Sequence, residues 1–216
     1  MDALTEQILN SDALSDKALA EKIDQFLHIH TEEVQTDGRD TFHCHRYEPA
    51  SYRVLHTLFE AIPLTEQDTL LDYGSGLGRL GFYTNHRFHN GAIGIELSET
   101  FHQAALHNLD QYRGVHRDRL TFIHGKAEDF IIPEEVTLIY CFNPFSTDIF
   151  RRVLTNTEKS YENKPRKITL ILYYPEDNTV FYIERHTGFR LTNEIAVPEL
   201  FERDRREKFC IYELGE

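Results

Sequence analysis

The sequence is poor in cysteine, the residue that a disulfide framework requires. It contains three cysteines among 216 residues, together with a single methionine and no tryptophan. Cys44, Cys141 and Cys210 are odd in number and widely spaced, which fits reduced thiols in the cytosol better than disulfides. We therefore expect a cytoplasmic protein.

Long apolar runs are also absent. No stretch approaches the roughly 20 apolar residues that a membrane-spanning helix requires. The first residues lack the charged, apolar and small-residue segments of a secretory leader. We expect no contact with a membrane.

Positive charge is scarce as well. The chain has 36 Asp and Glu against 23 Lys and Arg, so its formal net charge is −13. Proteins that hold a phosphate backbone gain affinity through Lys and Arg, because these release counterions. The average charge therefore disfavours a DNA or RNA substrate, although a local basic patch would permit one.

Apolar segments alternate with amphipathic helical patterns over most of the chain. The expected strands lie near residues 69–73, 92–96, 120–124, 136–142 and 167–174. Strands that alternate with helices imply parallel pairing through right-handed crossovers, and hence an α/β fold with a doubly wound sheet. Two further strand candidates, 189–197 and 207–214, are joined by a short charged connection, which allows an antiparallel pair at one edge.

The N-terminal part has a helical pattern of its own. One apolar stripe consists of Leu19, Ile23, Phe26 and Leu27. A second amphipathic helix is expected from Pro49 onward, and Ser98 is a suitable N-cap for a later one. We predict an N-terminal helical cap or lid over residues 1–48 and a main domain over residues 49–216.

A glycine-rich turn follows the first expected strand, in "LLDYGSGLGRLGFY" (residues 70–83). A dinucleotide fingerprint would need a small residue where Arg79 stands. A phosphate-binding P-loop would end in Gly-Lys-Ser/Thr, which is absent. A tight strand–helix turn without a ligand is the remaining local interpretation of this motif.

The turn resembles motif I of the class I S-adenosylmethionine-dependent methyltransferases, D-x-G-x-G-x-G. The residues that carry this resemblance are Asp72, Gly74, Ser75, Gly76 and Gly78. It implies a Rossmann-like sheet and S-adenosylmethionine as the cofactor, with these residues around it. An acid beside the turn suits a nucleoside ligand without phosphate, whereas it would repel a pyrophosphate.

Two downstream segments follow the order of the same family. "AIGIE" ends in Glu96, with Leu97 next, where the family places a carboxylate that binds the ribose hydroxyls. "FIHGKAEDF" follows the third strand, where the resemblance implies adenine contacts from Ala127, Glu128 or Asp129. Many relatives carry an acid before the alanine, but here that position is Lys126, so a solvated turn remains the alternative for both acids.

The acceptor side of the family is represented less completely. "LIYCFNPF" places Asn143 where relatives often have an (Asn/Asp)-Pro-Pro-aromatic motif, but Phe145 replaces the second proline. Asn143 is therefore a candidate for cofactor binding or catalysis, or a residue that only shapes the turn before the next helix. Tyr173 and Tyr174 end the fifth strand; we expect one in the core and the other near the substrate. No general base is identified.

Two other clusters have simpler interpretations. His43, Cys44 and His45 lie together in "FHCHRYEP", but no second ligand pair follows at a suitable spacing, so we expect no metal. Arg46 and Tyr47 in the same segment can contact the methionine carboxylate or close the pocket, or simply pack on the surface. The basic residues Arg203, Arg205 and Arg206 alternate with acids and are expected to be solvated.

Segments along nearly the whole chain resemble a family of small, poorly characterised bacterial methyltransferases. They are "RYEPASYRVL", "FNPFSTDIF", "PRKITLILYYP" and "EKFCIYEL". The resemblance implies an enzyme that methylates a small molecule or a protein side chain by in-line displacement. The alternatives are an RNA or DNA methyltransferase, a non-catalytic cofactor-binding module and, more distantly, a nicotinamide-dependent oxidoreductase.

Overall fold

The computed structural model describes residues 4, 8, 13–32, 49–142 and 146–215. A seven-stranded sheet with the order β3-β2-β1-β4-β5-β7-β6 forms its centre. The strands are β1 (Thr69–Tyr73), β2 (Gly91–Glu96), β3 (Leu120–His124), β4 (Leu138–Phe142), β5 (Ile168–Tyr173), β6 (Arg190–Ala196) and β7 (Lys208–Leu214). The predicted doubly wound, mostly parallel sheet is confirmed.

The strand order reverses direction at β1, which pairs with β2 on one side and with β4 on the other. In open α/β sheets, ligands bind outside the carboxyl ends of the strands at such a switch point. Strands β1 to β5 are parallel, whereas β7 is antiparallel to both β5 and β6. The predicted antiparallel pair is therefore present, with β7 inserted between β5 and the edge strand β6.

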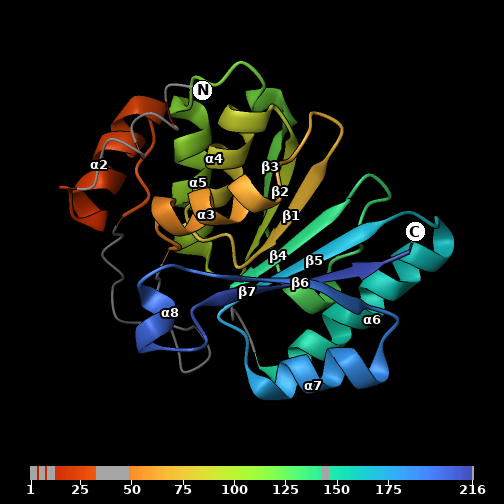
Figure 1. The fold of residues 1–216 in the computed structure, drawn as a ribbon. Helices are drawn as coiled ribbons and strands as arrows, with labels where there is room; N and C mark the ends of the chain where they lie inside the picture. Colours follow the sequence, from red (N-terminus) through yellow and green to blue (C-terminus); the bar gives the residue numbers. More distant parts are fainter. Residues whose placement is uncertain (1–3, 5–7, 9–12, 33–48, 143–145, 216) are drawn as a thin grey trace.

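Helices cover both faces of the sheet (Figure 1). One face carries α2 (Asp16–Leu27), α3 (Tyr52–Ala61), α4 (Arg79–Phe88) and α5 (Glu99–Gln111). The other face carries α6 (Thr147–Asn163) and α7 (Asp177–His186). Short helical turns complete the fold: η1 (Arg117–Arg119), η2 (Ala127–Asp129) and α8 (Leu200–Arg203). Among the described helices, none combines the length and the apolar character needed to cross a lipid bilayer.

Serine caps start three of the helices on the first face. The side chains of Ser15, Ser51 and Ser98 accept hydrogen bonds from backbone N–H groups in the first turns of α2, α3 and α5. Each cap satisfies a donor that has no partner within its helix. The predicted capping role of Ser98 is confirmed, with Phe101 as the donor.

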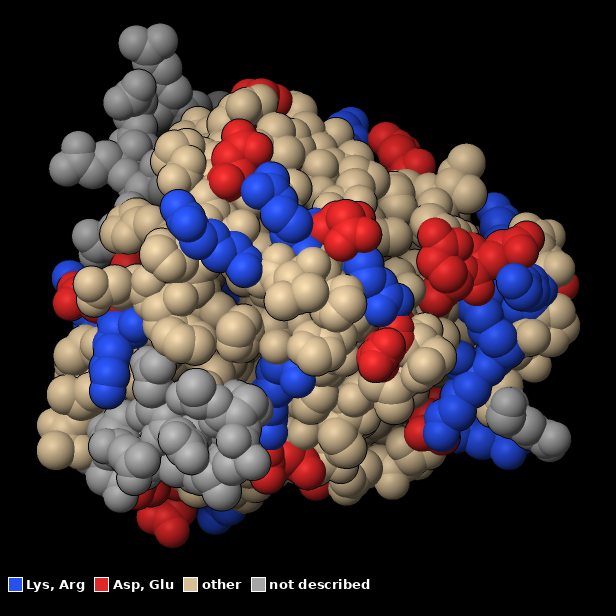
Figure 2. All heavy atoms as spheres, turned by 90° about the horizontal axis from the view of Figure 1, so that it is seen from above, with Lys and Arg blue, Asp and Glu red and all other residues tan. Residues whose placement is uncertain are grey.

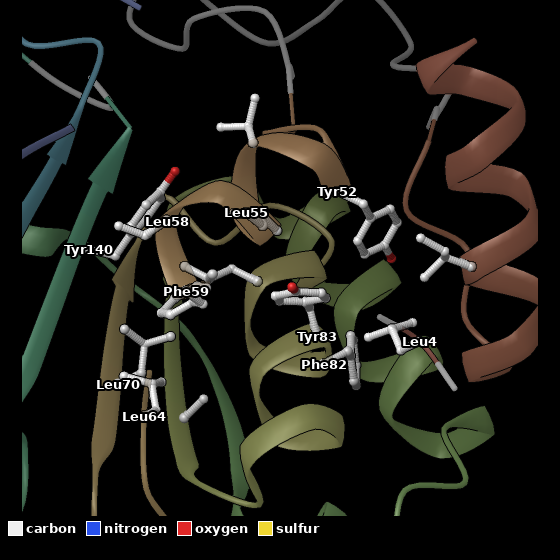
Figure 3. Packing of buried hydrophobic residues seen from close by; sticks show 14 of the residues in the cluster. Leu4, Tyr52, Leu55, Leu58, Phe59, Leu64, Leu70, Phe82, Tyr83 and Tyr140 are labelled. Atoms are coloured by element: carbon white, nitrogen blue, oxygen red, sulfur yellow. The ribbon is translucent and has the colours of Figure 1, made fainter. Parts of the chain in front are cut away.

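The N-terminal helix α2 shares its core with the sheet. Leu19, Ile23 and Leu27 belong to the same buried cluster as Tyr52 and Tyr83, and Figure 3 shows these two tyrosines close to each other beside the N-terminal helix. The prediction for Phe26 is wrong, because its side chain remains 37% exposed. The buried face of α2 includes the polar residue Asp24 beside Leu19, Ile23 and Leu27, and Phe26 lies at the margin of this face.

Candidate functional site

The glycine turn joins β1 to α4 at the switch point of the sheet. Gly74, Gly76 and Gly78 have φ angles of +77°, +53° and +88°, a region that other residues rarely adopt. Gly78 is also in close contact with the core, since a Cβ atom there would lie 2.6 Å from the ring of Phe122. The spacing of glycines in the motif is therefore required by the backbone of this turn.

The N–H groups of this turn are mostly used inside the protein. Gly74 and Ser75 both donate to the carbonyl of Ile95, at 2.9 and 3.1 Å. Gly76 donates to Glu96 Oε2 at 2.8 Å, and Gly78 donates to the Ser75 carbonyl at 2.8 Å. Phosphate-binding turns instead direct several N–H groups at the ligand. The turn is consequently not arranged as a cradle for a phosphate.

Glu96 lies at the carboxyl end of β2, beside the turn. Its side chain is 8% exposed, and its two oxygens accept from the N–H groups of Gly76, at 2.8 Å, and Ser98, at 2.7 Å. A carboxylate offers about four lone pairs, so each oxygen keeps the capacity for a further hydrogen bond. The carboxylate is therefore held in one orientation while it can still accept from a pair of hydroxyl groups.

Asp72 lies on β1, 6% exposed, and its carboxylate has no hydrogen-bond partner among the described residues. Burial, and secondly the nearby charge of Glu96, raise the pKa of Asp72 to about 8. A buried carboxylate without a partner is costly when it is ionised. This site would therefore favour a ligand that brings a positive charge to Asp72.

The raised pKa of Asp72 predicts a specific pH dependence of stability. Between pH 6 and pH 8 the unfolded chain has already lost the Asp72 proton, whereas the folded chain loses it only near pH 8, so the free energy of unfolding falls as pH rises. We expect the parent protein to lose about 2 kcal/mol more than Asp72→Asn over this interval. Urea unfolding of both proteins at the two pH values measures the difference, and equal losses would contradict the assignment.

Two further polar groups lie at this end of the sheet: Ser75, which the sequence predicts as a site residue, and Tyr140, which it does not. The hydroxyls of Ser75 and Tyr140 are buried and have no hydrogen-bond partner within the described part of the chain. Tyr140 of β4 lies in register with Asp72 of β1, and Figure 3 shows its hydroxyl directed away from Leu70. Its position in an apolar strand gave no signal; only the pairing of β1 with β4 reveals it.

The loops after β2 and β3 lie side by side, because Glu96 and His124 are paired in the sheet. Leu97 is 49% exposed and follows Glu96 directly. Ala127 begins the short helix η2 and is buried, whereas Glu128 is half-buried and Asp129 is exposed. The structure thus brings the expected adenine-side residues to the same rim as Glu96.

The two tyrosines at the end of β5 have different environments. Tyr173 is buried, stacks on Phe209 with ring centroids 4.7 Å apart, and donates its hydroxyl to Glu207. Tyr174 is half-buried, has a φ of +54°, and donates its hydroxyl to Asp204 at 2.6 Å. Positive φ in a bulky residue stores strain and is enriched at functional sites. Tyr174 is the better candidate for a contact with the acceptor.

Other sequence candidates lie outside the described residues. They are Asn143 with Pro144 and Phe145, and the segment that contains His43, Cys44, His45, Arg46 and Tyr47. Among the described residues, no group of three or more His, Cys, Asp or Glu is placed to hold a metal ion. The basic residues Arg203, Arg205 and Arg206 are exposed, as predicted, and the guanidinium of Arg206 lies 4.4 Å from the ring of Tyr174.

Solved structures share this arrangement of sheet and helices. An RNA methyltransferase from Salinibacter ruber, crystallised with S-adenosyl-L-homocysteine, matches 77% of this chain and 92% of its own length, with a TM-score of 0.55 and 16% identity. The glycopeptide N-methyltransferase MtfA, crystallised with S-adenosyl-L-methionine, matches 76% of this chain and 87% of its own, with a TM-score of 0.57 and 14% identity. The chain has the class I methyltransferase fold.

A third structure extends the comparison of this methyltransferase fold. A SAM-dependent methyltransferase from Geobacter sulfurreducens, crystallised with S-adenosyl-L-homocysteine, matches 80% of this chain and 94% of its own, with a TM-score of 0.53 and 16% identity. No protein-family model and no curated protein matches the chain. The names of the first two structures state different acceptors, an RNA and a glycopeptide, so the shared methyltransferase fold does not define an acceptor.

Proposed function

We propose that the chain binds S-adenosylmethionine and transfers its methyl group to a small molecule or a protein side chain. The observation that carries this proposal is the combination at the switch point of the sheet. The glycine turn uses most of its own N–H groups internally, and two buried carboxylates, Asp72 and Glu96, lie beside it. This combination suits a cationic nucleoside without phosphate and opposes a dinucleotide.

The residues that would hold the ligand have distinct tasks. Glu96 would accept from the two ribose hydroxyls with the lone pairs that Gly76 and Ser98 leave free. Asp72 would receive the ammonium of the methionine part, which would stabilise its ionised form. The Ser75 hydroxyl, buried without a partner among the described residues, would gain a hydrogen bond, and Leu97 would cover the adenine.

When bound, S-adenosylmethionine supplies a reactive methyl group on a sulfonium centre. The chain's own contribution to the reaction is alignment of the acceptor and exclusion of water. On the acceptor side, Tyr174 is held by Asp204 through its hydroxyl and by Arg206 through its ring, so its position is fixed before an acceptor arrives. A general base is needed only for an acceptor that must lose a proton early.

An RNA acceptor is less compatible with the charge of the chain. Figure 2, which views the molecule from above relative to Figure 1, shows Lys and Arg interspersed with Asp and Glu on the face that is seen. Such mixed charge does not concentrate counterion release along one track. The proposal therefore favours a small molecule or a protein side chain, and RNA is an outcome that the transfer experiment below would reveal.

Ligand-dependent melting tests the cofactor. At a hundred times the dissociation constant, a ligand that binds only the folded state adds about 2.7 kcal/mol of stability, which corresponds to a rise in Tm of about 5 to 10 °C. We expect this rise with S-adenosylmethionine and S-adenosylhomocysteine, and none with NAD. Stabilisation by NAD alone, or by none of the three, would contradict the proposal.

Transfer of a labelled methyl group tests the reaction. The protein is incubated with methyl-labelled S-adenosylmethionine and with separate small-molecule, protein and RNA fractions of a cell extract. Label in the first or second fraction supports the proposal, and label in the RNA fraction alone overturns its acceptor class. Binding without label in any fraction would count against transfer and favour a non-catalytic binding module.

A further inference from the structure

Arg79 is in an unusual place for a buried cation. It is the first residue of α4, directly after Gly78 of the glycine turn, and is only 5% exposed. A positive charge at a helix N-terminus is unfavourable because the helix dipole is positive there. A cation that is both buried and placed at this end needs strong compensation from its surroundings.

The groups that compensate the charge of Arg79 come from residues 31–32 and from residues 50–52. Arg79 Nε donates to Thr31 Oγ1 at 2.8 Å, Nη2 donates to the Thr31 carbonyl at 3.1 Å, and Nη2 forms an ion pair with Glu32. Nη1 donates to the carbonyl of Ala50 at 3.3 Å, and the guanidinium lies 4.8 Å from the ring of Tyr52. Residues on either side of segment 33–48 are thus bound to one side chain next to the glycine turn.

Asp24 of α2 holds these partners in place. Its carboxylate accepts from the backbone N–H of Thr31 at 2.5 Å, from the Thr31 hydroxyl at 2.9 Å, and from the Tyr52 hydroxyl at 2.6 Å. Burial raises the pKa of Asp24, while Tyr52 and the charge of Arg79 act in the opposite direction. Helix α2, helix α3 and the start of α4 are therefore joined by one buried polar network.

A second connection reaches the glycine turn itself. The side-chain amide of Asn108, on α5, accepts from the His30 N–H at 2.8 Å and donates to the His30 carbonyl at 2.9 Å. The same amide nitrogen donates to the carbonyl of Leu77, in the middle of the turn, at 3.0 Å. The short segment 28–32 is thus bound to the turn through two different side chains.

We propose that Arg79 and Asn108 are positioning residues that seat segment 28–32 against the glycine turn and keep the turn ready to bind the ligand. The N-terminal helix α2 is then part of the frame of the binding site. This inference rests on the proposed function, because it assigns the turn to S-adenosylmethionine. By thermodynamic reciprocity, a ligand that binds the turn must stabilise segment 28–32 in return.

The same helix supplies a matched control for Arg79. Arg87, two turns further along α4, has a side chain only 9% exposed and forms an ion pair with Glu60 of α3. Its guanidinium also donates to the Tyr83 hydroxyl at 2.9 Å and lies 4.8 Å from the ring of Phe88. Arg87 therefore joins α4 to α3 much as Arg79 does, but at the end of α4 remote from the glycine turn.

The test compares Arg79→Met with Arg87→Met in calorimetric titration with S-adenosylhomocysteine. Hydrogen exchange is followed at the amides of His30 and Thr31, with and without ligand. We expect Arg79→Met to weaken binding about tenfold, since it removes several hydrogen bonds made by a charged group, and Arg87→Met to leave the affinity within about twofold. Ligand should slow exchange at both amides in the parent and in Arg87→Met, and clearly less in Arg79→Met, where only Asn108 still connects segment 28–32 to the turn.

A milder variant covers the case in which Arg79→Met does not fold. Arg79→Lys keeps the charge beside Glu32 but loses the planar set of donors, and we expect it to weaken binding at least threefold. The inference is overturned if the folded Arg79 variants bind like the parent, or if affinity merely follows Tm in the variants at both positions. A parent that binds no S-adenosylhomocysteine at all would instead overturn the proposed function.

Discussion

Replacing Glu96 by alanine is expected to weaken binding of S-adenosylhomocysteine by about a hundredfold, since two hydrogen bonds to a charged group are lost. The carboxylate is held by Gly76 and Ser98 and keeps a lone pair on each oxygen, so it is already oriented to accept from a pair of hydroxyl groups. Titration calorimetry at constant pH measures the change in affinity. The Tm of each variant shows whether the fold is retained.

Glu213→Ala is the control for Glu96→Ala. Glu213 is also a strand acid, but it lies on β7 opposite the amino end of β5 and pairs with Lys167. Glu213→Ala removes an acid of the same sheet at the edge remote from the glycine turn. We expect the affinity for S-adenosylhomocysteine to stay unchanged. Equal affinities for the parent and Glu96→Ala would remove the ribose role from this residue.

Replacing Gly78 by alanine is expected to lower the free energy of unfolding by about 2 to 5 kcal/mol. The φ of Gly78 is +88°, and a Cβ atom would lie 2.6 Å from Phe122 Cζ and 2.8 Å from Phe82 Cε2. Both rings are buried between the sheet and α4, so they have little room to move. Urea unfolding at constant pH measures the loss.

Gly125→Ala is the corresponding control. Gly125 follows β3 on the same rim of the sheet, and a Cβ atom there would meet nothing within 4 Å. We expect a change in unfolding free energy of less than about 0.5 kcal/mol, as for other open surface positions. If Gly78→Ala were as stable as Gly125→Ala, the turn would not require the backbone conformation described above.

The fold was largely predictable because its strands and helices carry local signals. The five parallel strands are rich in apolar residues, and the start of α5 carries a serine cap with an acid in its first turn. The placement of β7 between β5 and β6 has no such local signal, since it depends on pairing between segments far apart in the chain. The sequence predicts an antiparallel pair at the edge of the sheet, but it does not predict which of the two strands lies next to β5.

The candidate site was predictable to the same extent. Asp72 and Glu96 could be assigned because they are the penultimate residue of β1 and the last residue of β2, and a recognisable turn follows each strand. Tyr140 could not, since its pattern within β4 is that of an ordinary core residue and its proximity to Asp72 comes from strand register. Phe26 shows the opposite case: its periodicity indicated burial, but the polar contacts of Asp24 turned the helix face away from it.

The amino-acid sequence by itself determined the positions of the strands, the glycine turn and the acids Asp72 and Glu96 near the strand ends, because each depends on neighbours a few residues away. Tertiary structure alone decided where the turn's N–H groups donate, which residue of β4 lies in register with Asp72, and what surrounds Arg79. These depend on contacts between Arg79 and Thr31, or Asn108 and His30, which are separated by 48 and 78 positions. Such contacts form only when packing brings distant segments together, and no local pattern encodes them.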